Sequence, residues 1–215
     1  MFILPLYVEL AAFVLGCLLV RRNWPVHYRF LVAFKCLAFG VSILGSFYSI
    51  WYHRSNHWLY NLFIPVEGIS YLYVFYKAAI HRTVRRIDGW LLLLVMPLIV
   101  LSYILSHSFF FLNTYAGMSC SFLPLLAACG TFIDLLADKR ELRLFRQPMF
   151  WMAAGVLLYS ISNIIFYIIW EYVKKMNYYN FFSIVYFLGT ALLNLGMIGC
   201  FICIYRQQPA RITAL

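Results

Sequence analysis

Charged residues are scarce in this chain, and acidic residues are the scarcest of all. Of its 215 residues, 7 are Asp or Glu, against 17 Lys or Arg. Charged residues make up 11% of the sequence, whereas apolar residues make up 65% and aromatic residues 20%. So few charges cannot cover a soluble globule with a polar surface. The composition therefore excludes the soluble classes and predicts an all-α protein that is solvated by lipid.

The chain also lacks a cysteine framework and any complete catalytic or cofactor motif. Its 6 cysteines all fall within apolar segments, so none is placed for an extracellular disulfide. Cys200 and Cys203 form a C-x-x-C pair, but no second pair or nearby histidine accompanies them. We therefore expect no cofactor, and an enzymatic function is not indicated.

Seven apolar segments fill most of the chain. A hydrocarbon core of about 30 Å requires about 20 helical residues to cross it, and each segment approaches or exceeds that length. The connections between them are too short to hold a soluble domain. We predict one domain over residues 1–215 with seven transmembrane helices, at 2–20, 30–52, 59–79, 90–106, 115–137, 150–173 and 181–205.

Basic residues are distributed unevenly over the connections between these helices. Lys and Arg near helix ends are retained in the cytoplasm. The outer connections hold Arg54, Lys174 and Lys175, whereas thirteen basic residues fall on the alternate connections and the C-terminal tail. This asymmetry predicts an outer N-terminus, a cytoplasmic C-terminus and contact with anionic membrane lipid. Because the charges are scattered, nucleic acid is not an expected partner. The thirteen are Arg21, Arg22, Arg29, Lys77, Arg82, Arg85, Arg86, Lys139, Arg140, Arg143, Arg146, Arg206 and Arg211.

A weak internal repeat relates the first three helices to the last three. Gly40 and Val41 in the second helix match Gly155 and Val156 in the sixth, and both of these helices follow a basic connection that contains a proline. The fourth helix has no polar stripe and would then be a linker. The pattern predicts a parallel 3+1+3 repeat, although similarity between apolar helices can also arise by chance.

Three runs of sequence resemble an uncharacterised family of small bacterial heptahelical integral membrane proteins. They are 6–10 (LYVEL), 59–67 (LYNLFIPVE) and 148–155 (PMFWMAAG). The resemblance implies a seven-helix fold in the bacterial inner membrane, and it implies no particular activity. Microbial rhodopsins share the helix count, but the seventh segment has no lysine to hold retinal.

Two acidic residues lie deep within the predicted helices. Glu9 and Glu67 each sit roughly 10 to 12 Å below the outer surface, at about 1.5 Å per residue. A charge at mid-bilayer costs about 2.5 to 3.5 kcal/mol or more, so such residues usually have a task. We predict that they face the bundle interior and line an outward-facing polar cavity, and the alternative is a purely structural hydrogen-bond cluster. The predicted ligand-binding residues are Glu9, Glu67, Asn163, Tyr7, Tyr71, Ser49 and Tyr186.

Three histidines fall near the outer surface. His53 and His57 would have the i, i+4 spacing of a zinc-binding pair if the second helix continued for one more turn, and His107 is the third. Ser49 followed by His53 resembles part of the pattern of heptahelical metal-dependent lipid hydrolases. That family also requires a histidine pair on the seventh helix, which has no histidine here. We therefore predict no metal site.

Two functions fit this pattern best. The first is a membrane sensor or receptor-like module that binds a small solute or lipid in the cavity. With a short C-terminal tail, such a sensor would signal through a separate cytoplasmic or membrane partner. The second is a small proton-coupled transporter that uses Glu9 or Glu67 as the proton carrier. A metal-dependent lipid hydrolase is the least favoured alternative, and the oligomeric state is left open.

Overall fold

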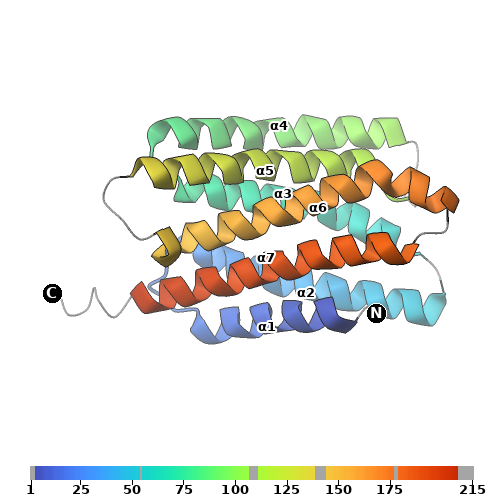
Figure 1. Ribbon diagram of the computed structural model, residues 1–215, viewed down its shortest axis with the longest axis horizontal. Coiled ribbons are helices and arrows are strands. Elements are labelled where there is room, and N and C mark those ends of the chain that lie inside the picture. Colours follow the sequence, from blue (N-terminus) through green and yellow to red (C-terminus); the bar gives the residue numbers. More distant parts are fainter. Residues whose placement is uncertain (1–2, 54, 107–110, 139–143, 177–178, 208–215) are drawn as a thin grey trace.

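The structure is a computed structural model, and it describes residues 3–53, 55–106, 111–138, 144–176 and 179–207. Within these residues the chain forms seven α-helices and one short 3-10 helix, and it is all-helical (Figure 1). The side chains of residues 3–5 and 171–183 lie outside the description. The helices are α1 (Ile3–Leu19), α2 (Val26–Tyr52), α3 (His57–Ala78), α4 (Arg82–Ser106), α5 (Thr114–Ala137), α6 (Pro148–Met176) and α7 (Tyr179–Gln207), with the 3-10 helix η1 at Leu144–Arg146.

The helices run alternately up and down along the long axis of the bundle, because each connection is short (Figure 1). Six of them form a closed ring, in which α1, α2, α3, α5, α6 and α7 each pack against the next and α7 returns to α1. Helix α4 lies outside this ring and packs against α3 and α5. The ring therefore has an interior to which six helices can contribute side chains.

Five helices are long and apolar enough to cross a membrane, which is consistent with integration into one. They are α2, α4, α5, α6 and α7. The described apolar part of α1 covers Leu6–Leu19, so it is shorter. Helix α3 has the length but also has Asn61, Glu67 and several tyrosines, which lower its hydropathy. The prediction of seven spans is therefore met in part, and the two remaining helices are those that carry the predicted acidic residues.

Several helices begin earlier than the apolar segments do. The largest difference is at α4, which begins at Arg82 and not at Trp90, so the predicted connection over residues 80–89 is mostly helical. Hydropathy locates the part of a helix that lipid can cover, and it carries no information about helical turns beyond that part. Arginine has a high helix propensity, so nothing in this stretch opposes an additional two turns.

Glycines set the closest contact in the ring, between α6 and α7. A Cβ atom at Gly196 would lie 2.6 Å from the carbonyl oxygen of Trp151 and 2.8 Å from the Cα atom of Gly155. Small residues allow helix backbones to approach closely where lipid provides no hydrophobic drive for association. This contact fixes α6 against α7 and so positions the polar side chains that both helices direct inward.

Candidate functional site

The carboxyl group of Glu67 is the best-supported polar group in the ring. The hydroxyl of Tyr71 donates to Oε1 at 2.9 Å, and the hydroxyl of Tyr159 donates to Oε2 at 2.9 Å. Tyr71 is one turn further along α3, whereas Tyr159 belongs to α6. Both tyrosines are buried. Each carboxyl oxygen thus has a hydroxyl donor, so neither is left unsatisfied.

A second polar contact is formed by Lys35 of α2. Its side chain is 2% exposed, and Nζ donates a hydrogen bond of 3.0 Å to Oδ1 of Asn194 on α7. The amide nitrogen of Asn194 donates to the backbone oxygen of Thr190 at 2.9 Å, which turns the amide oxygen toward Lys35. Lys35 therefore does not extend to the helix end as a membrane-embedded lysine commonly does.

Glu9 of α1 completes a set of three ionisable residues in the ring, of which Lys35 and Glu9 are buried and Glu67 is partly buried. Both Glu9 and Glu67 are close enough to Lys35 to interact with it electrostatically. The two carboxyl groups also interact with each other. Two acidic residues thus share one ammonium group inside the ring, so the cluster carries one formal negative charge in excess when all three are ionised.

The hydrogen bonds of this cluster cross the ring. Helices α3 and α6, which Glu67 and Tyr159 connect, are separated in the ring by α5. Helices α2 and α7, which Lys35 and Asn194 connect, are separated by α1. A change at the cluster can therefore act on helices that are not neighbours in the ring. We call Glu9, Lys35, Glu67, Tyr71, Tyr159 and Asn194 the ring cluster.

Asn163 lies on α6 one turn beyond Tyr159, on the same face. It is 4% exposed, and its Oδ1 has no hydrogen-bond partner among the described residues. One further turn along, Tyr167 is buried and packs so closely on α5 that a Cβ atom at Gly117 would lie 2.3 Å from its ring. Since a buried acceptor without a donor costs about 1 to 3 kcal/mol, Asn163 is a place where a ligand or water can bind.

The other predicted site residues divide into two groups. Tyr186 of α7 is partly buried and interacts electrostatically with Glu9, Glu67 and Tyr167, so it belongs beside the ring cluster. Tyr7 is 64% exposed, and Ser49 is also exposed. Tyr7 is two residues from Glu9, and residues two apart point to nearly opposite sides of a helix. The structure therefore does not bring Tyr7 or Ser49 to the ring cluster.

The predicted histidine pair does not form on one helix. Helix α2 ends at Tyr52, and His53 caps it in the left-handed region with φ of 48°. His57 begins α3, so the two residues are four apart in sequence but do not share the helix that a zinc-binding pair of this spacing needs. His107 lies outside the described residues. Among the residues that the structure describes, no group of three His, Cys, Asp or Glu side chains is placed to hold a metal ion.

A second cluster of ionisable groups lies at the end of the bundle where α3 passes into α4. Asp134 of α5 is buried and accepts from the backbone N–H groups of Ile80 at 2.6 Å and His81 at 3.0 Å. The Nδ1 atom of His81 lies 2.5 Å from the same carboxyl group. Asp134 thus organises the α3–α4 turn. Asp88 of α4 is buried and interacts electrostatically with Asp134.

Asn61, at the start of α3, has a structural task of its own. It is fully buried, donates to the backbone oxygen of Phe111 at 2.6 Å and accepts from the backbone N–H of Asn113 at 2.9 Å. The hydroxyl of Tyr103 donates to its backbone oxygen. These bonds attach the start of α5 to α3 and α4, so Asn61 positions helices and lies apart from the ring cluster.

The sequence left three members of the ring cluster unassigned, Lys35, Tyr159 and Asn194. A signal for Lys35 existed, because it lies about 13 Å from the start of α2 at roughly 1.5 Å per residue, beyond the reach of its own side chain to that end. Nothing in the sequence pairs Tyr159 with Glu67. No protein-family model, curated protein or solved structure matches the chain.

Proposed function

We propose that the protein is a multi-pass membrane sensor whose ring cluster binds a small solute and transmits that event to a separate partner. The observation that carries the proposal is the bond between Glu67 and Tyr159, which joins α3 to α6 across the ring. A solute that binds this carboxyl group would compete with the hydroxyl of Tyr159. The hydrogen bond would be kept or broken according to whether the solute displaces that hydroxyl. Helices α3 and α6, which are not neighbours in the ring, would then move relative to each other, and such a movement can be read at the bundle surface.

The composition of the ring cluster favours a small cation as the solute. Two carboxyl groups face one ammonium group, so a bound cation would balance the formal charge. Tyr71, Tyr159, Tyr167 and Tyr186 surround the carboxyl group of Glu67, and the faces of aromatic rings attract cations. The unpartnered oxygen of Asn163 is an acceptor for an ammonium hydrogen. A protonated primary amine combines all of these features.

The same proposal includes the orientation of the chain in the membrane and the 3+1+3 repeat of its helices. The basic residues at the α1–α2 and α3–α4 connections fall at one end of the bundle, which supports a cytoplasmic assignment of that end. They are Arg21, Arg22, Arg29, Lys77, Arg82, Arg85 and Arg86. The position of α4 outside the ring supports its role as a linker between two sets of three helices. The signalling partner would then contact the cytoplasmic end.

A proton-coupled transporter is the second candidate, and the observation that favours it is the same excess carboxyl group. A proton can neutralise the ring cluster in place of a cation, and an alternating cycle of the two would couple their movements. A lipid hydrolase receives less support, because His53 and His57 do not share a helix.

Methylammonium is a suitable probe for separating the two candidates. The purified chain in phosphatidylcholine nanodiscs should bind it saturably, with a change in hydrogen–deuterium exchange in α3 and α6. Glu67→Gln, which keeps the shape and removes the charge, should weaken binding roughly tenfold, the effect of about 1.4 kcal/mol. Tyr159→Phe, which removes one donor to Glu67, tests the same site. Tyr115→Phe, at an exposed tyrosine, is its matched control.

The same variants in proteoliposomes address transport. A sensor should show no uptake of radiolabelled methylammonium above protein-free vesicles and no change of internal pH. Saturable wild-type uptake that Glu67→Gln abolishes would replace the sensor with the transporter. If methylammonium neither binds nor moves, the cation assignment is wrong.

A further inference from the structure

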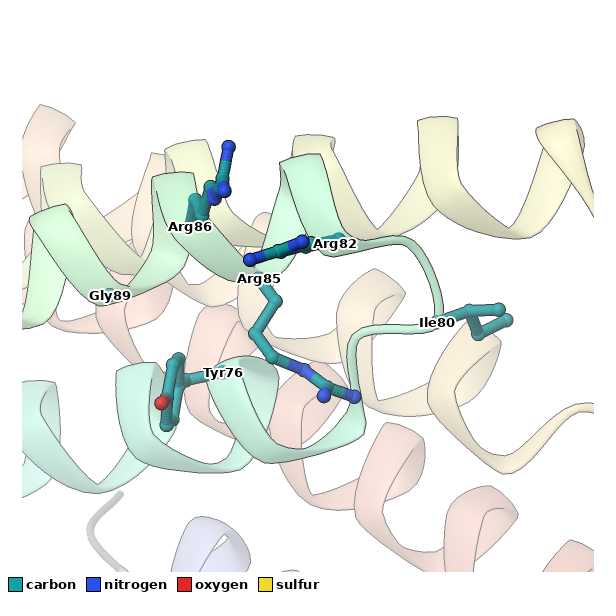
Figure 2. A pocket seen from close by; sticks show the side chains of 6 residues that line it. All are labelled: Tyr76, Ile80, Arg82, Arg85, Arg86 and Gly89. Carbon is teal, nitrogen blue, oxygen red and sulfur yellow. The ribbon is translucent and has the colours of Figure 1, made fainter.

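An open pocket of about 490 Å³ lies at the end of the bundle, between the last turns of α3 and the first turns of α4. It is lined by Tyr76, Ile80, Arg82, Arg85, Arg86 and Gly89 (Figure 2). Figure 2 shows Arg82 and Arg85 bordering the space next to α3, with Tyr76 opposite them and the end of Arg86 directed away. The pocket is separate from the ring cluster, and the sensor proposal makes no use of it.

The charge of this pocket is positive. Lys77 lies beside it, with Nζ 5.3 Å from the centre of the Tyr76 ring. Among the described residues, the ion pair found is that of His81 with Asp134, so none of the three arginines is paired with a carboxylate there. The acidic side chain of Asp134 is occupied by the backbone of the turn. Guanidinium groups gathered without a paired carboxylate are available to bind an anion.

The walls of the pocket are held in place by specific contacts. Arg85 donates from Nη2 to the backbone oxygen of Ala79 at 2.7 Å, which fixes its guanidinium group against the turn. Tyr76 lies against α4 at Gly89, where a Cβ atom would be in ordinary van der Waals contact with its ring at 3.5 Å. The carboxyl group of Asp134 fixes the turn itself through Ile80 and His81. The pocket is therefore preorganised before an anion arrives.

The surface next to the pocket indicates where that anion belongs. Helix α4 packs against α3 and α5, and its other face is apolar and exposed, beginning with Ile87 and Trp90, the latter 67% exposed, and continuing through Leu93 and Leu94. This face starts immediately beside the arginines. A molecule with a negative head and an apolar chain would therefore place its head in the pocket and its chain along α4.

We propose that this pocket binds a phosphate group, supplied by the headgroup of an anionic phospholipid whose acyl chain lies along α4. Arginine binds phosphate through paired N–H donors, and the geometry of a guanidinium group matches phosphate better than that of an ammonium group does. The first turn of α4 presents its backbone N–H groups at the same end, which adds to the attraction. The site is distinct from general attraction of basic loops to a charged membrane.

The test compares phosphatidic acid with phosphatidylcholine, titrated onto the detergent-purified chain and counted by native mass spectrometry. Wild type should bind phosphatidic acid preferentially. The double variant Arg82→Gln/Arg85→Gln should weaken that binding roughly tenfold. The single variant Arg82→Gln, which leaves the Arg85 bond to Ala79 intact, keeps the test valid if the double variant fails to fold, and it should still weaken binding several-fold.

The matched control is Arg22→Gln/Arg29→Gln, which removes the same charge from two exposed arginines at the same end of the bundle. It should leave binding within about twofold of wild type. An equal loss in the control pair would overturn the proposal, because the effect would then be general electrostatics. So would binding of both lipids with the same affinity.

Inorganic phosphate distinguishes the two sources of the phosphate group. If the lipid is the ligand, inorganic phosphate at tens of millimolar, on the order of its usual weak affinity for exposed sites, should not displace phosphatidic acid. Displacement that depends on Arg82 would keep the phosphate site and assign it to a soluble phosphate compound. Displacement that is independent of Arg82 would overturn the pocket as the site.

Discussion

Two carboxyl groups of this protein, that of the partly buried Glu67 and that of the fully buried Asp88, have opposite surroundings. Glu67, inside the ring, accepts hydrogen bonds from Tyr71 and Tyr159 and lies within electrostatic range of Lys35. Asp88, on α4 outside the ring, is 1% exposed, and neither of its oxygens has a partner among the described residues. The residue with which it interacts electrostatically is another carboxylate, Asp134. The ring interior is therefore arranged to hold charge, whereas the edge of α4 is not.

The difference indicates where a solute would act. A carboxyl group with two donors from different helices has a defined position, and a competitor for those donors produces a defined change. A carboxyl group without donors destabilises its surroundings and has no hydrogen bond to another helix that a solute could displace. The comparison therefore favours Glu67 over Asp88 as a functional residue, and substitutions on each side of it test that distinction.

The largest loss of stability is expected from Lys35→Met. The substitution removes the ammonium group, leaves Glu9 and Glu67 without a counter-charge and strands the amide oxygen of Asn194. Removal of one partner of a directly paired buried charge costs about 3 to 5 kcal/mol, which is an upper bound here because Lys35 acts on the two carboxyl groups from beyond ion-pair distance. Equilibrium unfolding in mixed micelles measures the cost. Lys77→Met, at an exposed lysine that contacts tyrosine rings, should cost less than about 1 kcal/mol, and an equal cost for both variants would refute the difference.

Tyr159→Phe is expected to cause the next largest loss of stability. It deletes one hydroxyl and leaves Oε2 of Glu67 without a donor, while the ring and its packing remain. A hydrogen bond to a charged group contributes about 1.5 to 3 kcal/mol. Tyr115→Phe removes a hydroxyl from an exposed ring and should change the free energy of unfolding by less than about 0.5 kcal/mol. If Tyr159→Phe is equally neutral, the bond across the ring is not significant.

Gly196→Ala acts on the same region through packing. The added Cβ atom would meet the backbone of Trp151 and Gly155 and push α7 from α6, which carries Tyr159. Overpacking of this kind costs about 1 to 3 kcal/mol. Gly40→Ala, where a Cβ atom has nothing within 4 Å, should instead stabilise α2 by about 0.5 to 1 kcal/mol. Destabilisation by both variants would show that the close α6–α7 contact is not the cause.

Asp88→Asn is expected to have the smallest effect and the opposite sign. The substitution removes a buried charge that has no donor and that is repelled by Asp134. At neutral pH, relief of this penalty should stabilise the protein by about 1 kcal/mol. Thermal unfolding followed by intrinsic fluorescence can measure the shift. A loss of stability would show that the carboxyl group of Asp88 has a favourable partner after all, and the comparison with Glu67 would then fail.

The sequence predicted the helical class and the approximate helix positions, because apolar segment length is a local property. It could not predict that α4 begins at Arg82, since hydropathy does not report helix outside the lipid. Glu67 was found from its depth alone. The placement of Lys35 inward and of Tyr7 outward depends on how each helix is rotated, which hydropathy does not determine. Helical periodicity could have excluded Tyr7. It lies two residues from the buried Glu9, and residues two apart point to nearly opposite sides of a helix.

The central claim, that Glu67 holds α3 to α6 across the ring, is tested most directly by a double-mutant cycle of Glu67→Gln and Tyr159→Phe. The free energy of unfolding of wild type, both single variants and the double variant gives the interaction between the two side chains without other contributions. Residues in direct contact are expected to show a coupling of about 0.5 to 3 kcal/mol, and a bond to a buried carboxylate should lie in the upper half of that range. Additive effects, with a coupling near zero, would contradict the account.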